Sequence, residues 1–165
     1  MSKSIKTILY ATDINEGSSV VFQVALNLAK QYQAKLLFLH VVEPLGTTAA
    51  AAVSIYFPSG SLEEFYKQSM DEAYKNINMK MESLYKKKLE DELPGEQFQS
   101  YILEGIPATT IIKTAEKMDA DIIVLGSNSH STLDNFLVGS VANKVINRSS
   151  KPVLLVPVKS HSSER

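Results

Sequence analysis

Residues Asp121–Val158, which read DIIVLGSNSHSTLDNFLVGSVANKVINRSSKPVLLVPV, decide the fold of this chain. The stretch begins with a short apolar run, Asp121–Leu125, that is typical of a buried strand and leads into Gly126. A polar turn follows, and Gly139-Ser140 then opens a segment with helical spacing. Glycine directly after a strand, and again at a helix start, lets backbone N–H groups come close to a phosphate. The stretch therefore predicts a strand, an anion-binding loop, a helix and a final strand.

Further apolar runs outside this stretch predict the other strands of one sheet. The five expected strands are Ile5–Ala11, Ala34–Val42, Gln97–Leu103, Asp121–Leu125 and Pro152–Val156. Three of these runs are nearly continuous in Leu, Ile and Val, as in strands of a parallel sheet covered on both faces.

Apolar residues at helical spacing predict helices between these strands. Ser18–Tyr32 is expected to be the first helix, because its apolar residues recur at i, i+4 and i+8. Ser61 followed by Glu64 forms a capping-box pattern that opens a long helix, which should end before Pro94-Gly95. Pro107 suits the first position of the next helix. The expected apolar stripe of the long helix is Leu62, Tyr66, Met70, Ala73, Ile77, Met81 and Leu84.

The regular alternation of strands and helices predicts the fold class. It indicates an α/β protein with an open, parallel five-stranded sheet, right-handed crossovers and helices on both faces. Residues 1–159 are expected to form a single domain, and residues 160–165 a disordered tail. The long loop Pro44–Gly60 is rich in Ala, Gly and Pro, and loops of this length are usually functional or mobile.

Composition excludes several classes of function. The chain has 165 residues with 17 basic and 18 acidic side chains, and its net charge of -1 argues against a nucleic-acid partner. It contains no cysteine, which excludes disulfides, thiolate zinc sites and cysteine nucleophiles. We see no secretory signal and no apolar run near the ~20 residues of a membrane helix, so a soluble cytoplasmic protein is expected. The three histidines, His40, His130 and His161, are too scattered for a metal site.

Polar residues follow two of the predicted strands and form the candidate binding site. Ligands of open α/β sheets bind beyond the carboxyl ends of the strands, where Ala11-Thr12-Asp13 and Gly126-Ser127-Asn128-Ser129 lie in this chain. If the two strands are neighbours, these residues flank one crevice. Asp13 could accept hydrogen bonds from a ribose or a base, or it could only cap the following helix. Gly139-Ser140-Val141 would offer N–H groups at a helix start, although the glycines could also form an ordinary turn and cap.

With these residues, the chain resembles the universal stress proteins, in their nucleotide-binding branch. The resemblance covers nearly the whole chain, from the opening KTILYATD to the closing KPVLLVPV. The phosphate motif of that family is Gly, two residues, Gly, nine residues, then Gly and Ser or Thr. Here the motif reads Gly126, two residues, Ser129, nine residues and Gly139-Ser140.

The resemblance implies a Rossmann-like fold similar to the adenine nucleotide α-hydrolases, with strand order 3-2-1-4-5. It implies ATP in the crevice, with a divalent cation such as Mg2+ because no P-loop lysine supplies positive charge. Asp13 and Val41 would contact the adenosine. Ribose and phosphates would lie against Gly126, Ser129, Gly139, Ser140 and Val141. It further implies a homodimer through Pro152–Val158 and leaves further pairing into tetramers open.

Ser129 is the main departure from the family pattern. If that position needs a left-handed backbone, a serine costs roughly 1–2 kcal/mol, which weakens ATP binding without abolishing it. Ser129 therefore favours one alternative, a nucleotide-free family member that acts as a protein-interaction module. A second alternative is an ATP-using enzyme such as a nucleotidyl transferase, although the chain lacks an S-G-G-x-D-S loop after its first strand. Hydrolysis is expected to be slow at best, because Arg148 and Arg165 are not placed to stabilise a transition state.

Overall fold

Five parallel strands form one sheet in the order β3-β2-β1-β4-β5. The structure, a computed structural model, describes residues 4–15, 17–44, 46, 52, 55–56, 61–127 and 138–158. The strands are β1 (Thr7–Ala11), β2 (Lys35–Val42), β3 (Phe98–Glu104), β4 (Ile122–Gly126) and β5 (Val153–Val156). This topology confirms the fold class and the strand order that the sequence predicted.

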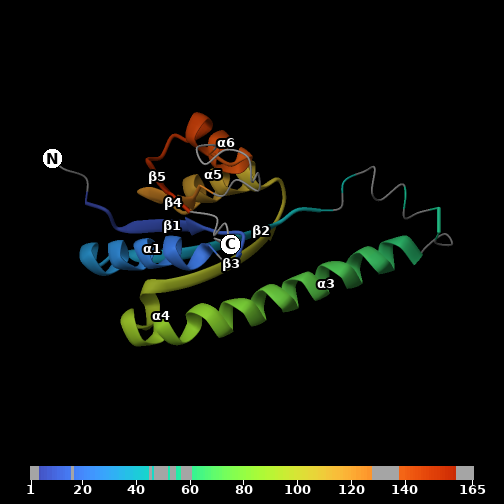
Figure 1. The fold of residues 1–165 in the computed structure, drawn as a ribbon, viewed down its shortest axis with the longest axis horizontal. Coiled ribbons are helices and arrows are strands. Elements are labelled where there is room, and N and C mark those ends of the chain that lie inside the picture. Colours follow the sequence, from blue (N-terminus) through green and yellow to red (C-terminus); the bar gives the residue numbers. More distant parts are fainter. Residues whose placement is uncertain are drawn as a thin grey trace, which may run out of the picture.

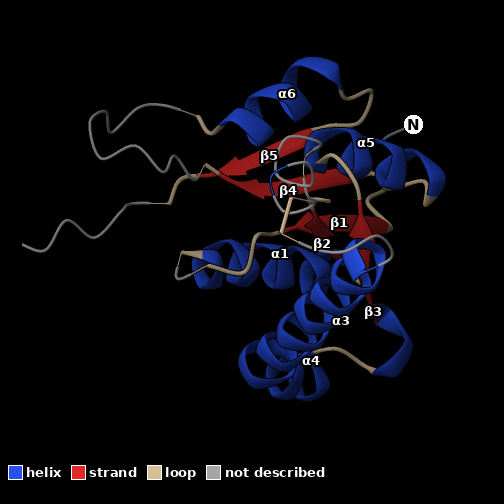
Figure 2. Ribbon diagram, turned by 90° about the vertical axis from the view of Figure 1, so that its right-hand side faces the viewer, coloured by secondary structure: helices blue, strands red, loops and turns tan. Residues whose placement is uncertain are grey.

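Helices cover both faces of the sheet (Figures 1 and 2). One face carries α1 (Ser18–Tyr32), α3 (Ser61–Met81), the π-helix η1 (Glu82–Lys86) and α4 (Lys87–Glu92). The other face carries α5 (Pro107–Lys117) and α6 (Ser140–Arg148). A short 3-10 helix, η2 (Gly95–Gln97), precedes β3.

The two faces of the sheet bury separate hydrophobic clusters, because successive side chains of a strand point to opposite sides. Ile8 and Tyr10 of β1 belong to the cluster under α1, whereas Leu9 and Ala11 belong to the cluster under α5 and α6. All four side chains are at most 5% exposed. The near-continuous apolar runs of the sequence therefore reflect a central sheet that is buried on both sides.

The sequence predicted most element boundaries to within two residues. The first helix has the expected bounds, Ser18–Tyr32. Each observed strand begins one or two residues later than expected, and β3 and β4 each end one residue later. Pro107 occupies the first turn of α5, as predicted.

The long second helical segment differs from the expected regular helix. Only Met81 is buried among the residues of α3, and Figure 1 shows this helix running out beyond the sheet. Leu84, which was expected on the apolar face, is 58% exposed, and Tyr85 is buried in its place. The π-helix η1 causes the shift, since its wider turn changes which side chains face the sheet. The expected apolar stripe is therefore wrong at Leu84, whereas Met81 is buried as expected.

Several sequence expectations lie outside the described residues. They include Ser129, His130, most of the Pro44–Gly60 loop and the tail from residue 160. Among the residues that the structure describes, no helix has both the length and the apolar character needed to cross a bilayer.

Candidate functional site

A cleft of about 290 Å³ opens at the carboxyl ends of β1, β2 and β4. Its walls bring together residues that are more than a hundred positions apart in the sequence. Eight of the expected site residues line it, namely Ala11, Thr12, Asp13, Val41, Gly126, Gly139, Ser140 and Val141. The cleft forms where the strand order reverses, between β1 and β4, which is where open α/β sheets bind ligands.

Two other expected site residues are not part of this lining. Ser127 lies next to Gly126, but its hydroxyl accepts a hydrogen bond from the Val158 amide at 3.0 Å. Its own amide donates to the Val156 carbonyl at 2.9 Å, so Ser127 ties β4 to the end of β5. Ser129 lies outside the described residues, and its role remains a prediction.

The loop after β1 forms one wall of the cleft and is held by local hydrogen bonds. The amide of Gly17 donates to Asn15 Oδ1 at 3.1 Å, and the amide of Ser18 donates to the Asn15 carbonyl at 3.0 Å. The Asn15 side chain also donates to Asp13 Oδ2 at 2.8 Å. Asn15 therefore makes the turn that enters α1, a role that the sequence had left open for Asp13. The exposed Asp13 carboxylate lies at the rim of the cleft.

Ile14 holds a strained backbone conformation in this loop. Its φ is 55°, in the left-handed region, which costs a β-branched residue on the order of 1–2 kcal/mol. The side chain is only 6% exposed and packs in the cluster under α1. Its amide donates to Thr12 Oγ1 at 3.0 Å. Burial and this hydrogen bond offset the strain and fix the direction of the loop beside Asp13.

The amino terminus of α6 faces the cleft from the opposite side. Gly139 has φ -56° and ψ 155°, so it lies outside the helix, and its carbonyl accepts the Asn143 amide at 2.9 Å. The amides of Ser140 and Val141 precede this first helical bond and have no acceptor within the helix. Since both residues line the cleft, their N–H groups and the positive end of the helix dipole favour an anion there.

The sequence did not single out several other residues that line the cleft. They are Tyr10, Gly17, Ser18, Val21, Leu39, Glu43, Pro107, Ile111, Leu125, Ala142 and Val158. Leu39 shares the face of Val41 by the period of two in a strand, so that residue could have been inferred. Tyr10 and Ser18 carried no such signal, because a strand residue and a helix start are ordinary scaffold positions.

The charges of the described lining residues are all negative. Asp13 and Glu43 are carboxylates, and no lysine, arginine or histidine belongs to the described lining. Backbone N–H groups are therefore the only positive partners that this part of the cleft offers to an anion. Among the described residues, no cluster of three or more metal-ligating side chains occurs.

His40 of β2 contacts the loop that forms one wall of the cleft. Its Nδ1 lies 2.8 Å from the Thr12 carbonyl oxygen, to which the neutral ring can donate. Burial lowers the pKa of His40 below the usual 6.5, and the Lys80 ammonium also lowers it. The Thr12 carbonyl and the Asp13 carboxylate oppose this effect without reversing it. His40 thus joins the end of β2 to the loop after β1.

We expect His40 to make the fold less stable in mildly acidic solution. The unfolded chain binds a proton at this ring below pH 6.5, whereas the folded chain resists protonation until a lower pH. The free energy of unfolding should therefore fall as the pH decreases from 6.5 toward the lower pKa of the folded state. Urea unfolding at about pH 7.5 and 5.5 checks this expectation, with His40→Gln as the comparison. An equal pH dependence in both proteins would contradict it.

Comparisons with known proteins agree with this fold and cleft. The model of the universal stress protein family matches residues 4–157. Universal stress protein MJ0577 from Methanocaldococcus jannaschii is 32% identical over 163 residues, covering 96% of this chain and 99% of that protein. Its solved structure matches with a TM-score of 0.71 at 33% identity, again over 96% of this chain and 99% of that one.

Two more distant structures contain adenine nucleotides. One is a universal stress protein in complex with cAMP, and the other is from Archaeoglobus fulgidus in complex with dAMP. Each is 20% identical to this chain with a TM-score of 0.58, and each match covers 95% of this chain and 100% of the other. At this identity the two structures show the shared fold alone. The family match and the MJ0577 relative, each spanning most of the sequence, show that this chain belongs to the universal stress protein family.

Proposed function

We propose that this chain binds ATP in the cleft and acts in the cytoplasm as a nucleotide-responsive stress or signalling factor. One observation carries the proposal: the ends of β1 and β4 and the start of α6 line a single cleft of about 290 Å³. This volume is close to the lower end of about 300 Å³ for small-molecule sites, so the cleft suits the nucleoside and its nearest phosphates. The adenine nucleotides bound by two family members support the choice of ligand.

The polarity of the cleft supports one orientation of the nucleotide. The adenosine would lie against Ala11, Thr12, Asp13 and Val41, where Asp13 can accept hydrogen bonds from ribose hydroxyls. The phosphates would lie near Gly126 and the start of α6, where Gly139, Ser140 and Val141 present backbone N–H groups. Ser127 and Ser129 would flank the phosphates in the loop after β4.

A divalent cation belongs to the proposed ligand. A triphosphate brings several negative charges into a lining whose charged side chains, among the described residues, are Asp13 and Glu43. Mg2+ binds phosphate oxygens and carboxylates readily and would neutralise part of this charge. We therefore expect affinity for ATP to fall when the cation is removed with EDTA.

Fast hydrolysis does not fit the arrangement of charges. An arginine that stabilises the transition state is worth 10³–10⁵ in rate. Arg148, the one arginine in the described part of the chain, is the last residue of α6, whose first residue lines the cleft. Eight helical steps of 1.5 Å separate the two ends by roughly 12 Å. We therefore expect the proposed factor to hydrolyse ATP more slowly than ~1 s⁻¹, the lower end of typical kinase turnover rates.

Calorimetric titration with ATP, with and without Mg2+, tests the proposal. We expect saturable binding of one nucleotide per chain that weakens in EDTA. An absence of binding at millimolar nucleotide would refute the function and favour the interaction module that Ser129 suggests. A product assay showing turnover at or above ~1 s⁻¹ would instead favour the ATP-using enzyme.

We further propose that two chains pair through Pro152–Val158. Strand β5 ends the sheet, and the carbonyl groups of Val156 and of Pro152, which precedes the strand, accept hydrogen bonds from Ser127 and Ile123 on the β4 side. Since the N–H and C=O groups of alternate residues in a strand point the same way, Val153 and Leu155 present theirs to the outer edge. An apolar edge of this kind is a template for pairing with another strand.

Proline at Leu155 should therefore break the dimer. Leu155→Pro removes one outward N–H group while leaving the backbone bonds of Pro152 and Val156 to the β4 side in place. Leu155→Ala is the matched control, because it shortens the side chain and keeps the N–H. Sedimentation velocity should show dimers for the wild type and Leu155→Ala, and monomers for Leu155→Pro. A Leu155→Pro protein that remains dimeric would show that pairing does not use this edge.

A further inference from the structure

The π-helix η1, Glu82–Lys86, carries a buried side chain, Tyr85, into the core of the fold. Met81, Tyr85, Leu89 and Leu93 are all buried and follow each other at intervals of four residues. In an α-helix each such step advances about 40° past a full turn, so the two helical steps from Met81 to Leu89 would rotate the side chain by about 80°. The wider turn of η1, Glu82–Lys86, reduces this drift. Met81, Tyr85 and Leu89 therefore all join the cluster under α1.

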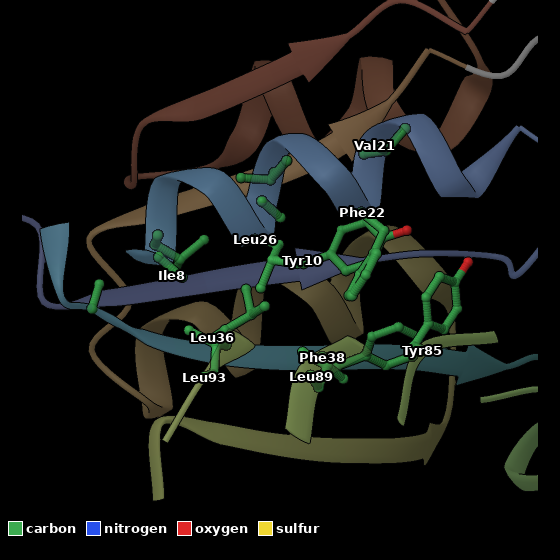
Figure 3. Packing of buried hydrophobic residues seen from close by; sticks show 14 of the residues in the cluster. Ile8, Tyr10, Val21, Phe22, Leu26, Leu36, Phe38, Tyr85, Leu89 and Leu93 are labelled. Atoms are coloured by element: carbon green, nitrogen blue, oxygen red, sulfur yellow. The ribbon is translucent and has the colours of Figure 1, made fainter. Parts of the chain in front are cut away.

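Tyr85 lies in an aromatic cluster, and the far end of its ring carries a polar hydroxyl group. Its ring packs against Phe22 with a centroid distance of 4.4 Å and against Phe38 at 5.5 Å (Figure 3). The side chain is 3% exposed, and its hydroxyl forms a hydrogen bond with the hydroxyl of Ser18, which is 4% exposed. Two buried hydroxyl groups that satisfy each other are costly to separate, because water cannot replace the lost partner.

Ser18 connects this buried bond to the cleft. It is the first residue of α1 and lines the cleft beside Gly17. Its carbonyl accepts a hydrogen bond from the Tyr10 hydroxyl at 3.0 Å, and Tyr10, which is fully buried, also lines the cleft. Figure 3 shows the hydroxyl ends of Tyr10 and Tyr85 on the side where the strands end. The start of α1 is thus held by two tyrosines, one from β1 and one from a helix 67 residues further along the chain.

We propose that Tyr85 is a positioning residue for the cleft: through its hydrogen bond to Ser18 it fixes the start of α1 in the orientation that nucleotide binding requires. The inference rests on the proposed function, because it concerns the same cleft. The aromatic packing of Tyr85 needs only a ring, and a phenylalanine would supply it equally well. The hydroxyl adds a bond whose partner is a residue of the cleft wall, which ties the geometry of that wall to η1.

The variant Tyr85→Phe tests this role, since it removes the hydroxyl and keeps the ring. We expect the affinity for Mg-ATP to fall about threefold to tenfold, as for the loss of one buried hydrogen bond. Ser18→Ala should weaken binding to a similar degree, and adding Tyr85→Phe to it should change the affinity little further. Such non-additivity is the mark of two groups that act as a pair.

Two control variants separate positioning from general loss of stability. Ser83→Ala removes a hydroxyl from the same π-helix, where it donates only within its own segment, to the Lys80 carbonyl. Ile8→Val destabilises the same core cluster at the opposite end of β1. Both controls should bind Mg-ATP as the wild type does. If Ile8→Val weakens binding as much as Tyr85→Phe at equal loss of thermal stability, the positioning role is wrong.

Hydrogen exchange of the protein without nucleotide separates this inference from the proposed function. The amides of residues 17–21 should exchange at least threefold faster in Tyr85→Phe than in the wild type and in Ser83→Ala, because the start of α1 has lost a tether. Unchanged exchange there would overturn the role of Tyr85, whether or not the chain binds nucleotide. If the wild-type chain binds no ATP but Tyr85→Phe still exchanges faster than the wild type at residues 17–21, the tether by Tyr85 stands and only the proposed function is refuted.

Discussion

Replacing Gly126 with valine is expected to weaken the binding of Mg-ATP by about 5- to 150-fold. A Cβ atom at this position would lie 3.0 Å from Val21 Cγ2 and 3.2 Å from Val158 Cγ2, closer than most side-chain contacts. Val21 and Val158 already occupy the space beside Gly126, so the two methyl groups of valine must take up part of the cleft. Overfilling a packed site costs about 1–3 kcal/mol, which corresponds to that range of affinity.

The matched control is Gly95→Val, which adds the same side chain where a Cβ meets no atom within 4 Å. Calorimetric titration of both variants, at a temperature where circular dichroism shows each to be folded, checks the expectation. Normal binding by Gly126→Val would show that the nucleotide does not approach the end of β4. Weak binding by Gly95→Val would show that the loss is not specific to the cleft.

Replacing Gly105 with alanine is expected to destabilise the fold by about 2–4 kcal/mol. Gly105 joins β3 to α5 with a φ of 156°, a backbone conformation that residues with a side chain rarely adopt. A Cβ atom there would lie only 2.4 Å from Thr110 Oγ1, in the first turns of α5. Backbone strain of about 1–2 kcal/mol adds to the displacement of a β-branched side chain with few alternative rotamers. The melting temperature should fall by roughly 5–15 °C.

The double variant Gly105→Ala/Thr110→Ala separates these two costs. Thr110→Ala removes the hydroxyl oxygen that the new Cβ would meet, so it should restore about 1 kcal/mol and leave the backbone strain. Urea unfolding of the wild type, both single variants and the double variant gives the four free energies. A Gly105→Ala protein as stable as the wild type would contradict a tight turn before Pro107, a residue of the cleft wall.

The sequence predicted the sheet well because burial on both faces leaves a direct signal. Strands β1, β2 and β4 are mostly apolar, and their buried side chains alternate between the two core clusters. The first helix was predicted with the same bounds because its apolar stripe is regular. Strand β3 lies at the edge of the sheet, and its mixed sequence FQSYILE carries a weaker apolar signal, with several of its side chains only half-buried or exposed.

The π-helix could not be predicted from apolar spacing alone. Leu84 and Tyr85 both fit a helical stripe with Met81, but continuing the stripe from Ile77 favours Leu84, which lies seven residues further on. The choice of Tyr85 depends on tertiary contacts, namely its packing with Phe22 and Phe38 and the hydroxyl bond to Ser18. None of these partners is near it in the sequence.

The sequence indicated which residues line the candidate site better than it indicated their backbone conformations and hydrogen bonds. Eight expected residues line one cleft because the carboxyl ends of adjacent parallel strands meet at one edge of the sheet. The left-handed Ile14 gave no signal, since glycine or asparagine is the usual residue there and isoleucine is tolerated only because it is buried. The sequence did not indicate that the Ser127 hydroxyl accepts the Val158 amide, and a contact of Ser127 with a ligand stays a prediction.

Backbone N–H groups at the start of α6 are the central feature of the proposed site, and NMR observes them directly. Titration of the ¹⁵N-labelled wild type with Mg-ATP should shift the amide signals of Ser140 and Val141 saturably, together with that of Gly126. The amide of Gly95, far from the cleft lining, should not move. Saturable ATP binding that leaves the amides of Ser140 and Val141 unshifted, or no binding at all, would contradict the proposed site.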